Sequence, residues 1–278
     1  MAAPTSAGSP AEADTSGRVS TGALLLNSLV ALLLGTGITI LLHEIGHWVA
    51  GALLGSRSFL FAFGVTQEPP LSGTALALEA LAGPVVSLVI GGVMQILQPF
   101  RFKGNFAHLL WIWTACTSLM ATVTYLVVTP VAGDTAVAVS ALGLPVWVVF
   151  VAMAVGVAGM FGVSQLWSVH AVRLCGREPS RLRHFSWFPW LIAVPIQAGM
   201  LIVYLALARM QVGPLEQIVL ITAGMAQTVF GPMSMMFVGR SQELEEPLHV
   251  KPVPWIGIAG FVALVAFNVA ISGGLGLG

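Results

Sequence analysis

The residues with the clearest chemical potential are His43, Glu44 and His47, which stand in the pattern H-E-x-x-H. Residues four apart lie on one face of a helix, so both imidazoles can point at one metal ion. Glu44 is adjacent and can reach a water molecule at that ion, as in zinc-dependent hydrolysis. The alternative is a helix with two packed histidines and a buried carboxylate, but buried charge without pairing is costly. The spacing therefore predicts a metal centre with Glu44 as general base.

The surroundings of this motif are strongly apolar. The chain has 278 residues, of which 57% are hydrophobic and 8% are charged, whereas soluble domains carry about 25% charged residues. This composition predicts a polytopic membrane protein embedded in the lipid bilayer. The 11 basic and 11 acidic residues balance, so nothing indicates binding to nucleic acid.

Seven apolar segments are long enough to be considered as membrane spans, because a spanning helix needs about 20 residues. They are 22–54, 80–98, 107–129, 142–168, 187–208, 214–238 and 254–274. The first is over-long and is expected to run past the bilayer or to break near Gly51 or Gly55. The predicted fold class is all-α and polytopic, with six to seven transmembrane helices. We divide the chain into a disordered tail (1–20), a core (21–145) and additional transmembrane helices (146–278).

A change of period follows the first apolar segment. Aromatic side chains at Phe59, Phe61 and Phe63 alternate within 58–66, residues 67–73 have the composition of a turn, and 74–78 alternate again. This pattern predicts a small membrane-associated β-hairpin with strands at 58–66 and 74–78. An apolar loop lying in the membrane interface is the alternative.

A third metal ligand has to come from elsewhere in the chain, because a catalytic zinc ion takes three protein ligands and an open position. Asp134 is the preferred candidate, since it follows the third apolar segment directly. Glu79, Glu68, His108 and His170 are rivals. Asp134 could instead serve only as a turn or helix N-cap residue. Successive membrane spans alternate in direction, so the first and third spans end on the same side of the bilayer. The His pair, in the second half of the first span, and Asp134, just after the third, are therefore expected on that side.

The second apolar segment carries a run of small residues. Gly83, Ser87 and Gly91 recur at every fourth position, which lets two helix backbones approach closely in lipid. Pro84 suits the first turn of a helix. We therefore expect the helix to open at Ala82-Gly83-Pro84 and to pack closely on a neighbour.

Three blocks of this chain resemble the site-2 protease family of intramembrane zinc metalloproteases. Residues 43–48 (HEIGHW) followed by 56–64 are similar to the family's H-E-x-G-H helix and the hairpin after it. Residues 82–87 (AGPVVS) are similar to its A-G-P-x-x-N element, and Asp134 falls where the family has an Asp-Gly ligand block. Ser87 replaces the family's Asn, and Gly133-Asp134-Thr135 replaces Asp-Gly. The resemblance covers about residues 35–145.

The resemblance implies a function and a set of roles. One Zn²⁺ ion would be held by His43, His47 and Asp134, and Glu44 would be catalytic in cleaving peptide bonds of a transmembrane protein substrate. Substrate contacts are expected at Gly83, Pro84, Ser87, Phe61 and Phe63.

Two other functions remain open at this point. One is a catalytically silent zinc-binding scaffold or regulator, which would bind metal and cleave nothing. The other is a metal or proton transporter, which needs polar residues along several helices; the later segments offer few, such as Gln197 and Gln227.

Basic residues predict the orientation in the membrane. Arg57 and Arg209 fall on one side. The remainder fall on the N-terminal side: Arg18, Arg101, Lys103, Arg173, Arg177, Arg181, Arg183, Arg240 and Lys251. By the positive-inside rule, this count predicts a cytoplasmic N-terminus.

Overall fold

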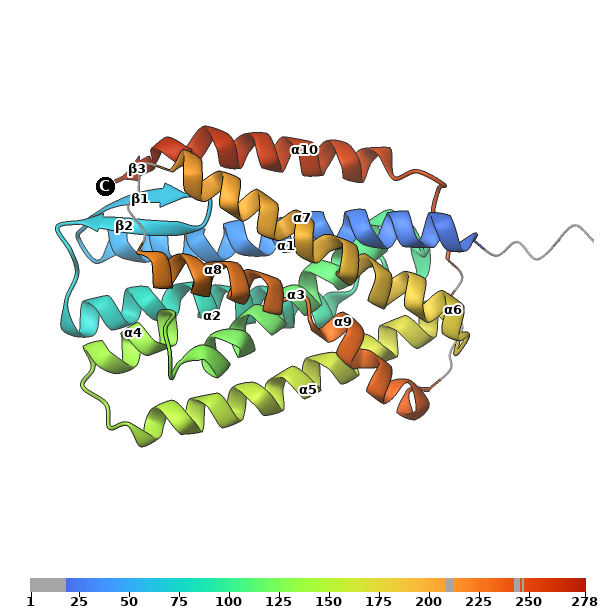
Figure 1. Cartoon of the computed structure of the whole chain (residues 1–278), viewed down its shortest axis with the longest axis horizontal. Helices are drawn as coiled ribbons and strands as arrows, with labels where there is room; N and C mark the ends of the chain where they lie inside the picture. Colours follow the sequence, from blue (N-terminus) through green and yellow to red (C-terminus); the bar gives the residue numbers. More distant parts are fainter. Residues whose placement is uncertain (1–18, 209–212, 243–245, 247) are drawn as a thin grey trace, which may run out of the picture.

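The computed structural model describes residues 19–208, 213–242, 246 and 248–278. Within this part of the chain, seven helical segments are long and apolar enough to cross a membrane (Figure 1). They are Thr21–Leu53, Gly73–Leu97, Phe106–Val128, Trp147–Cys175, Pro179–Leu207, Leu220–Arg240 and Trp255–Gly273. The prediction of an all-α polytopic membrane protein is confirmed. The expected disordered tail lies, except for its last two residues, outside the described residues, as does Arg209.

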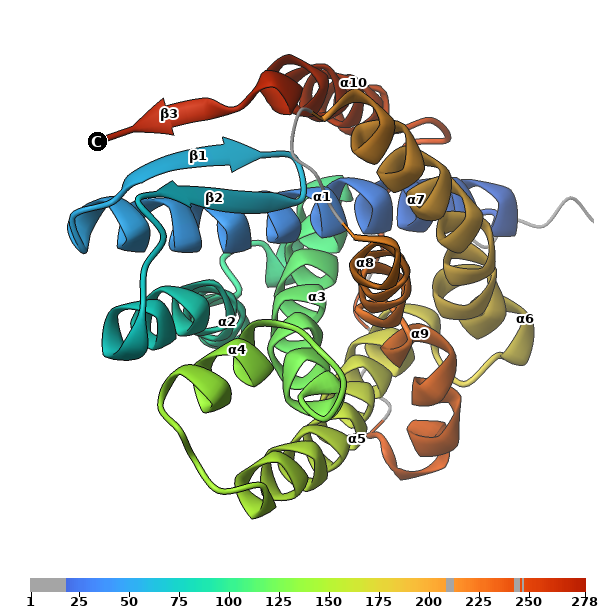
Figure 2. The same cartoon turned by 60° about the vertical axis from the view of Figure 1, so that its left-hand side comes forward.

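Helix α1 (Thr21–Leu53) is the axis around which the other helices pack. Its 33 residues correspond to about 50 Å at 1.5 Å per residue, longer than a hydrocarbon core of about 30 Å. The Ser20 side chain accepts from the Ala23 amide and caps its start. The helix does not break at Gly51; it ends at Leu53, and Gly55 follows with φ +89°. Figure 2 shows α7 and α10 on one side of α1, and α2, α3 and α5 on the other.

The remaining helices follow the predicted segments with shifted boundaries. They are α2 (Gly73–Leu97), α3 (Phe106–Val128), α4 (Asp134–Ala141), α5 (Trp147–Cys175), α6 (Pro179–Leu182), α7 (Phe188–Leu207), α8 (Pro214–Ala226), α9 (Phe230–Met233) and α10 (Trp255–Ala270). Short non-α turns are η1 (Arg101–Lys103), η2 (Arg183–Trp187), η3 (Ser234–Arg240) and η4 (Ile271–Gly273). The predicted span at 214–238 is therefore interrupted, because a turn at residues 227–229 separates α8 from α9.

A three-stranded antiparallel sheet lies against α1. Strands β1 (Arg57–Phe61) and β2 (Gly64–Glu68) form the hairpin, and β3 (Leu275–Leu277) pairs with β1 from the end of the chain. The order β2-β1-β3 leaves β1 paired on both edges. Within the described residues, β2 pairs only with β1, so its outer edge is open.

The predicted hairpin exists, but its second strand was placed wrongly. Phe61 pairs with Gly64, so the turn consists of Ala62 and Phe63, and residues 64–68 form the returning strand. Residues 74–78 belong to α2 instead. The alternation there spans only five residues, and Ala and Leu are among the strongest helix formers.

The predicted start of the second helix was also wrong. Helix α2 begins at Gly73, so Pro84 lies in the interior of the helix rather than in its first turn. The Pro84 carbonyl accepts a hydrogen bond from Thr122 Oγ1 of α3 at 3.1 Å. This bond links α2 to α3 at the position of the proline.

An aromatic cluster forms the core near the start of α1. The rings of Trp113 and Trp167 are 3.9 Å apart, and Phe230 lies 5.5 and 5.1 Å from them. Trp113 Nε1 donates to Ser28 Oγ at 3.0 Å. These side chains are fully buried, and they tie α1, α3, α5 and α9 together at a distance from the H-E-x-x-H motif.

Candidate metal centre

The two histidines of the motif point to one place, as the helical spacing predicts. His43 Nε2 and His47 Nε2 lie 3.1 Å apart, and their rings are edge-on at 71°. Both residues are buried, with 4% and 6% of their surface exposed. One turn of α1 therefore places two imidazole nitrogens side by side in the interior of the protein.

Asp134 joins them from a distant part of the chain. Its Oδ2 atom lies 3.0 Å from His43 Nε2 and 3.2 Å from His47 Nε2. Gly133, with φ +91°, turns the chain into α4, so Asp134 occupies the first residue of that helix. Thr135 Oγ1 donates to the Tyr125 carbonyl at 2.8 Å and fastens this turn to α3.

The three donor atoms fit a single metal ion. In a tetrahedral zinc site with bonds of about 2.0–2.1 Å, donor atoms lie roughly 3.3 Å apart. The observed separations of 3.0, 3.1 and 3.2 Å form one triangular face of such a site. The group His43, His47 and Asp134 can therefore hold one metal ion, and the fourth position is left for water or substrate.

Outer partners fix the direction of both rings. His47 Nδ1 lies 2.8 Å from the Glu79 carbonyl oxygen, which can only accept, so Nδ1 is the donor of this hydrogen bond and Nε2 is the ring nitrogen left to face a metal ion. His43 Nδ1 lies 3.1 Å from Ser87 Oγ. Gln67 Nε2 donates to Glu79 Oε1 at 2.7 Å and holds this residue in place. Such partners orient the ligands of metal sites and raise their basicity.

These contacts change the role assigned to two sequence candidates. Ser87, expected to contact substrate, lies against His43. Glu79, considered as a rival ligand, is an outer partner of His47. The contribution of Gln67 was not anticipated, because a contact between the hairpin and α2 has no local signature in the sequence.

Gly83 lets α2 approach the two imidazoles. A Cβ atom at this position would collide with His47 Nε2 and would lie 2.7 Å from His43 Nε2. Gly46 on α1 makes the reciprocal approach, since its Cβ would lie 3.0 Å from the Ala82 carbonyl. The small-residue run in α2 therefore serves close packing, as predicted, and it does so at the metal centre.

Tyr125 was not identified from the sequence, although it flanks the site. Its ring stacks on His43 at 4.8 Å with an interplanar angle of 9°. Stacking of this kind limits rotation of the His43 ring about its Cβ–Cγ bond. It adds a third constraint on His43, besides Ser87 and Asp134.

The charge of Asp134 suits a metal ligand. Burial disfavours its ionised form, but the neighbouring imidazoles of His47 and His43 outweigh burial and hold the pKa of Asp134 well below its usual range. Its position in the first turn of α4 favours the anion further. The carboxylate is therefore ionised over the whole physiological pH range.

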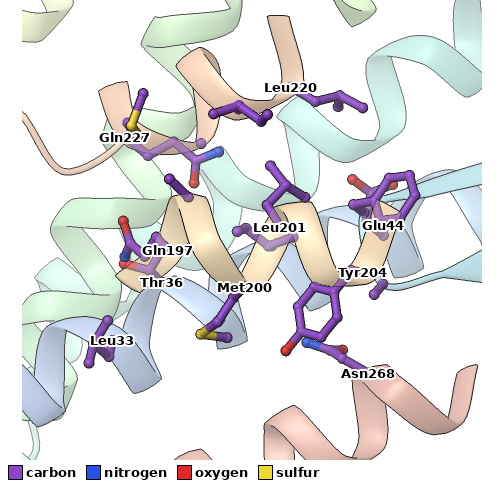
Figure 3. Close-up of a pocket in the computed structure, with 18 of the residues that line it drawn as sticks. Leu33, Thr36, Glu44, Gln197, Met200, Leu201, Tyr204, Leu220, Gln227 and Asn268 are labelled. Atoms are coloured by element: carbon purple, nitrogen blue, oxygen red, sulfur yellow. The ribbon is translucent and has the colours of Figure 1, made fainter. Parts of the chain in front are cut away.

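Two cavities meet beside Glu44, whose side chain is 7% exposed. The first, about 540 Å³, contains His47, Asp134 and the β2 residues Gly64 and Val65. The second is narrow and apolar and runs along α1 between α7 and α8 (Figure 3). Glu44 and Phe63 line both, so the Glu44 carboxylate stands where the two spaces adjoin.

The other sequence candidates lie in varied places. Phe63 is at the cavity junction, while Phe61 packs against Gly274 next to β3. Pro84 faces α3 through its carbonyl. Glu68 ends β2 and is exposed. The histidines considered as rival ligands are elsewhere: His170 contacts Gln95 at 3.0 Å, and His108 is buried in α3.

Comparison of the chain with protein-family models, with curated proteins and with solved structures gives no match. The geometry of the site is therefore the basis for assigning a function.

Proposed function

We propose that this protein is an intramembrane zinc metalloprotease that hydrolyses peptide bonds of membrane-embedded substrates. The observation that carries the proposal is the meeting of His43, His47 and Asp134 at one point, with Glu44 on the neighbouring cavity wall. Zinc bound by such ligands lowers the pKa of water to about 7 and polarises carbonyl oxygens. Histidine and aspartate donors at these spacings suit zinc better than calcium or magnesium, which favour oxygen ligands.

Glu44 supplies the proton transfers in this proposal. It takes a proton from the attacking water and delivers it to the nitrogen of the leaving amine as the peptide bond breaks. Its burial between two cavities keeps it beside the reacting atoms and away from bulk water. Ser87 and Glu79 hold the imidazole rings in the orientation that the reaction requires.

A substrate helix hides its peptide groups in its own hydrogen bonds, so it must unwind before it can be cut. The open edge of β2 is suited to receive the unwound segment by strand addition, because β1 is already paired on both sides. Residues of β2 line the same cavity as His47 and Asp134. The strand can therefore align a substrate backbone next to the metal centre.

The basic residues support an orientation with the N-terminus in the cytoplasm. Arg101 pairs with Glu246 at 2.9 Å, and Arg181 donates to the Val19 carbonyl. These contacts gather the basic loops at the end of the bundle where α1 begins (Figure 1). Among the described basic residues, Arg57 lies at the opposite end. By the positive-inside rule, the metal centre then faces the other side of the membrane.

The decisive test combines metal analysis with peptide cleavage. The full chain, purified in lipid nanodiscs, is expected to contain one zinc ion per molecule and to cut model transmembrane peptides. Glu44→Gln should keep the zinc ion and lose activity by roughly 10²–10⁴-fold, whereas Asp134→Asn should lose the zinc ion. Glu178→Gln, a matched change at an exposed carboxylate just before α6, should affect neither.

The same measurements separate the alternatives. A zinc ion retained without any cleavage, in the wild-type chain as in Glu44→Gln, identifies a silent metal-binding scaffold. Zinc movement into liposomes that contain the protein identifies a transporter. A wild-type preparation without metal after growth in zinc-rich medium rejects the proposal altogether.

A further inference from the structure

The narrow cavity beside Glu44 has a polar end that the proposed chemistry does not use. Its walls are mainly apolar side chains of α1, α7 and α8. At the end away from Glu44, Thr36, Gln197 and Gln227 converge from α1, α7 and the turn after α8 (Figure 3). Thr36 and Gln227 are 2% and 6% exposed.

The polar atoms at this end lack partners. Thr36 Oγ1, Gln227 Oε1 and both amide atoms of Gln197 are buried, and none has a hydrogen-bond partner among the residues that the structure describes. Burying a polar group without a partner is destabilising, and in a membrane it finds no bulk water. Three such side chains from three elements at one end of this cavity therefore indicate a ligand that supplies the missing hydrogen bonds.

The shape and chemistry of the cavity define this ligand. Its volume is about 90 Å³, while one water molecule needs roughly 10–15 Å³. A helix, about 10–12 Å wide with side chains, does not fit, but a side chain of an unwound segment can enter this space. A lipid acyl chain would leave the amides unsatisfied. No charged side chain lies at the polar end, so the matching group is uncharged and both donates and accepts, as Asn, Gln, Ser and Thr do.

The position along α1 gives a distance. Thr36 and Glu44 are eight residues apart in one helix, which corresponds to about 12 Å at 1.5 Å per residue. An extended chain covers about 3.3–3.6 Å per residue. In an extended bound segment, the residue whose side chain reaches the polar end is therefore roughly three to four residues away from the peptide bond that lies beside Glu44.

We propose that Thr36, Gln197 and Gln227 form a specificity subsite that binds an uncharged polar residue of an unwound membrane segment, three to four residues from the bond at the metal centre. This inference rests on the proposed function for the identity of the ligand, while the binding site itself does not require catalysis. Gln197 and Gln227 contact the ligand, and the apolar wall accepts the intervening side chains.

The test uses Leu- and Ala-rich transmembrane peptides that carry a single Asn at a series of positions. Binding to the Glu44→Gln chain in nanodiscs is measured by fluorescence, and cutting by the wild-type chain is mapped by mass spectrometry. Asn at the favoured position should strengthen binding roughly threefold to tenfold over the all-apolar peptide, and the cut should move with the Asn at a constant offset of three to four residues.

Variants of the subsite should abolish this preference. Gln197→Met, Gln227→Met and Thr36→Val keep the size of the side chain and remove its hydrogen bonding, so the advantage of the Asn peptide should disappear. Met200→Leu, an apolar exchange on the same wall, should leave it unchanged. The three variants should fold with an equal or higher melting temperature, because they remove unpaired polar atoms.

Each outcome is informative. Binding that depends on Asn without any cleavage supports the subsite and rejects the protease. If binding and the position of the cut do not depend on where the Asn lies, or if Gln197→Met keeps the preference for the Asn peptide, the subsite proposal is overturned. The protease proposal would still stand in that case. A cavity that retains a lipid while showing no peptide binding also overturns it. The peptide series with Asn at different positions is cut by the wild-type protein. The subsite proposal can therefore be tested even if one of the variants does not fold.

Discussion

Replacement of Gly83 by Ala gives the sharpest test of the metal centre, because it adds one methyl group directly against the ligands. The new Cβ atom would lie 2.7 Å from His43 Nε2 and closer still to His47 Nε2. To regain an ordinary contact of 3.4 Å, His43 Nε2 must withdraw by about 0.7 Å. Zinc sites tolerate deviations of only about 0.2 Å in their bond lengths.

The displacement predicts a specific loss of metal. Loss of a single outer partner lowers the affinity of a metal site by 10–100-fold, and here two ligand atoms must move, so Gly83→Ala should weaken zinc binding by roughly 100-fold or more. The alternative response is that α2 shifts away from α1, at about 1–3 kcal/mol of overpacking strain. Either response leaves the aromatic core in place, so the protein should still fold.

Zinc affinity is measured by competition with a chromophoric chelator, together with the thermal midpoint in detergent. Gly92→Ala is the matched control, because Gly92 lies in the same helix and a Cβ there meets nothing within 4 Å. That variant should bind zinc normally and gain up to about 1 kcal/mol from its better helix propensity. If Gly83→Ala binds zinc as tightly as the wild type, the proposed packing of α2 against the imidazoles is refuted.

Three further outcomes are expected. Ser87→Ala should lower zinc affinity by roughly 10–100-fold, because His43 loses its outer partner, whereas Ser164→Ala in α5 should not; equal affinities would contradict the role of Ser87. Trp113→Ala should lower the free energy of unfolding by about 3–5 kcal/mol without changing the zinc affinity, as measured by denaturation and chelator competition. Removal of zinc from the wild-type chain should lower the thermal midpoint of unfolding, since zinc at 100 times its Kd adds about 2.7 kcal/mol to the free energy of unfolding. An identical midpoint with and without zinc would show that the folded protein does not bind it.

The meeting of the three candidate ligands could be predicted from the sequence because their positions follow from helix periodicity and from topology. His43 and His47 are one turn apart in a segment whose helical nature is unambiguous. Asp134 is 87 residues beyond His47, yet the alternation of helix direction across the bilayer brings the end of the third helix back to the H-E-x-x-H level. Few helix ends lie on each side of the bilayer, so the proximity of Asp134 to His43 and His47 could be inferred from the order of the helices alone.

The orienting partners could not be predicted in the same way. Glu79 binds His47 through its backbone carbonyl, a group that every residue carries and that no pattern marks. The start of α2 and the register of the hairpin depend on whether residues 74–78 form a strand or a helix, and the short alternation there was misleading. The polar end of the second cavity depends on how α7 and α8 meet α1. Gln197 and Gln227 were visible as rare polar residues, but their convergence was not.

The arrangement of the three donor atoms explains how this site can hold a cation. His47 Nδ1 donates a hydrogen bond to the Glu79 carbonyl oxygen, so in the neutral ring Nε2 carries the lone pair that can bind a metal ion. The carboxylate also presents lone pairs, and His43 Nε2 completes the triangle at 3.0–3.1 Å from the other two. When both Nε2 atoms are unprotonated, as metal binding requires, the three atoms are acceptors that repel one another in a medium of low dielectric constant unless positive charge lies between them. Gly83 keeps α2 so near to this triangle that the ligands cannot withdraw towards that helix. The packing of two helices thus keeps three donor atoms close enough to hold one cation, and Glu44 lines both of the adjacent cavities.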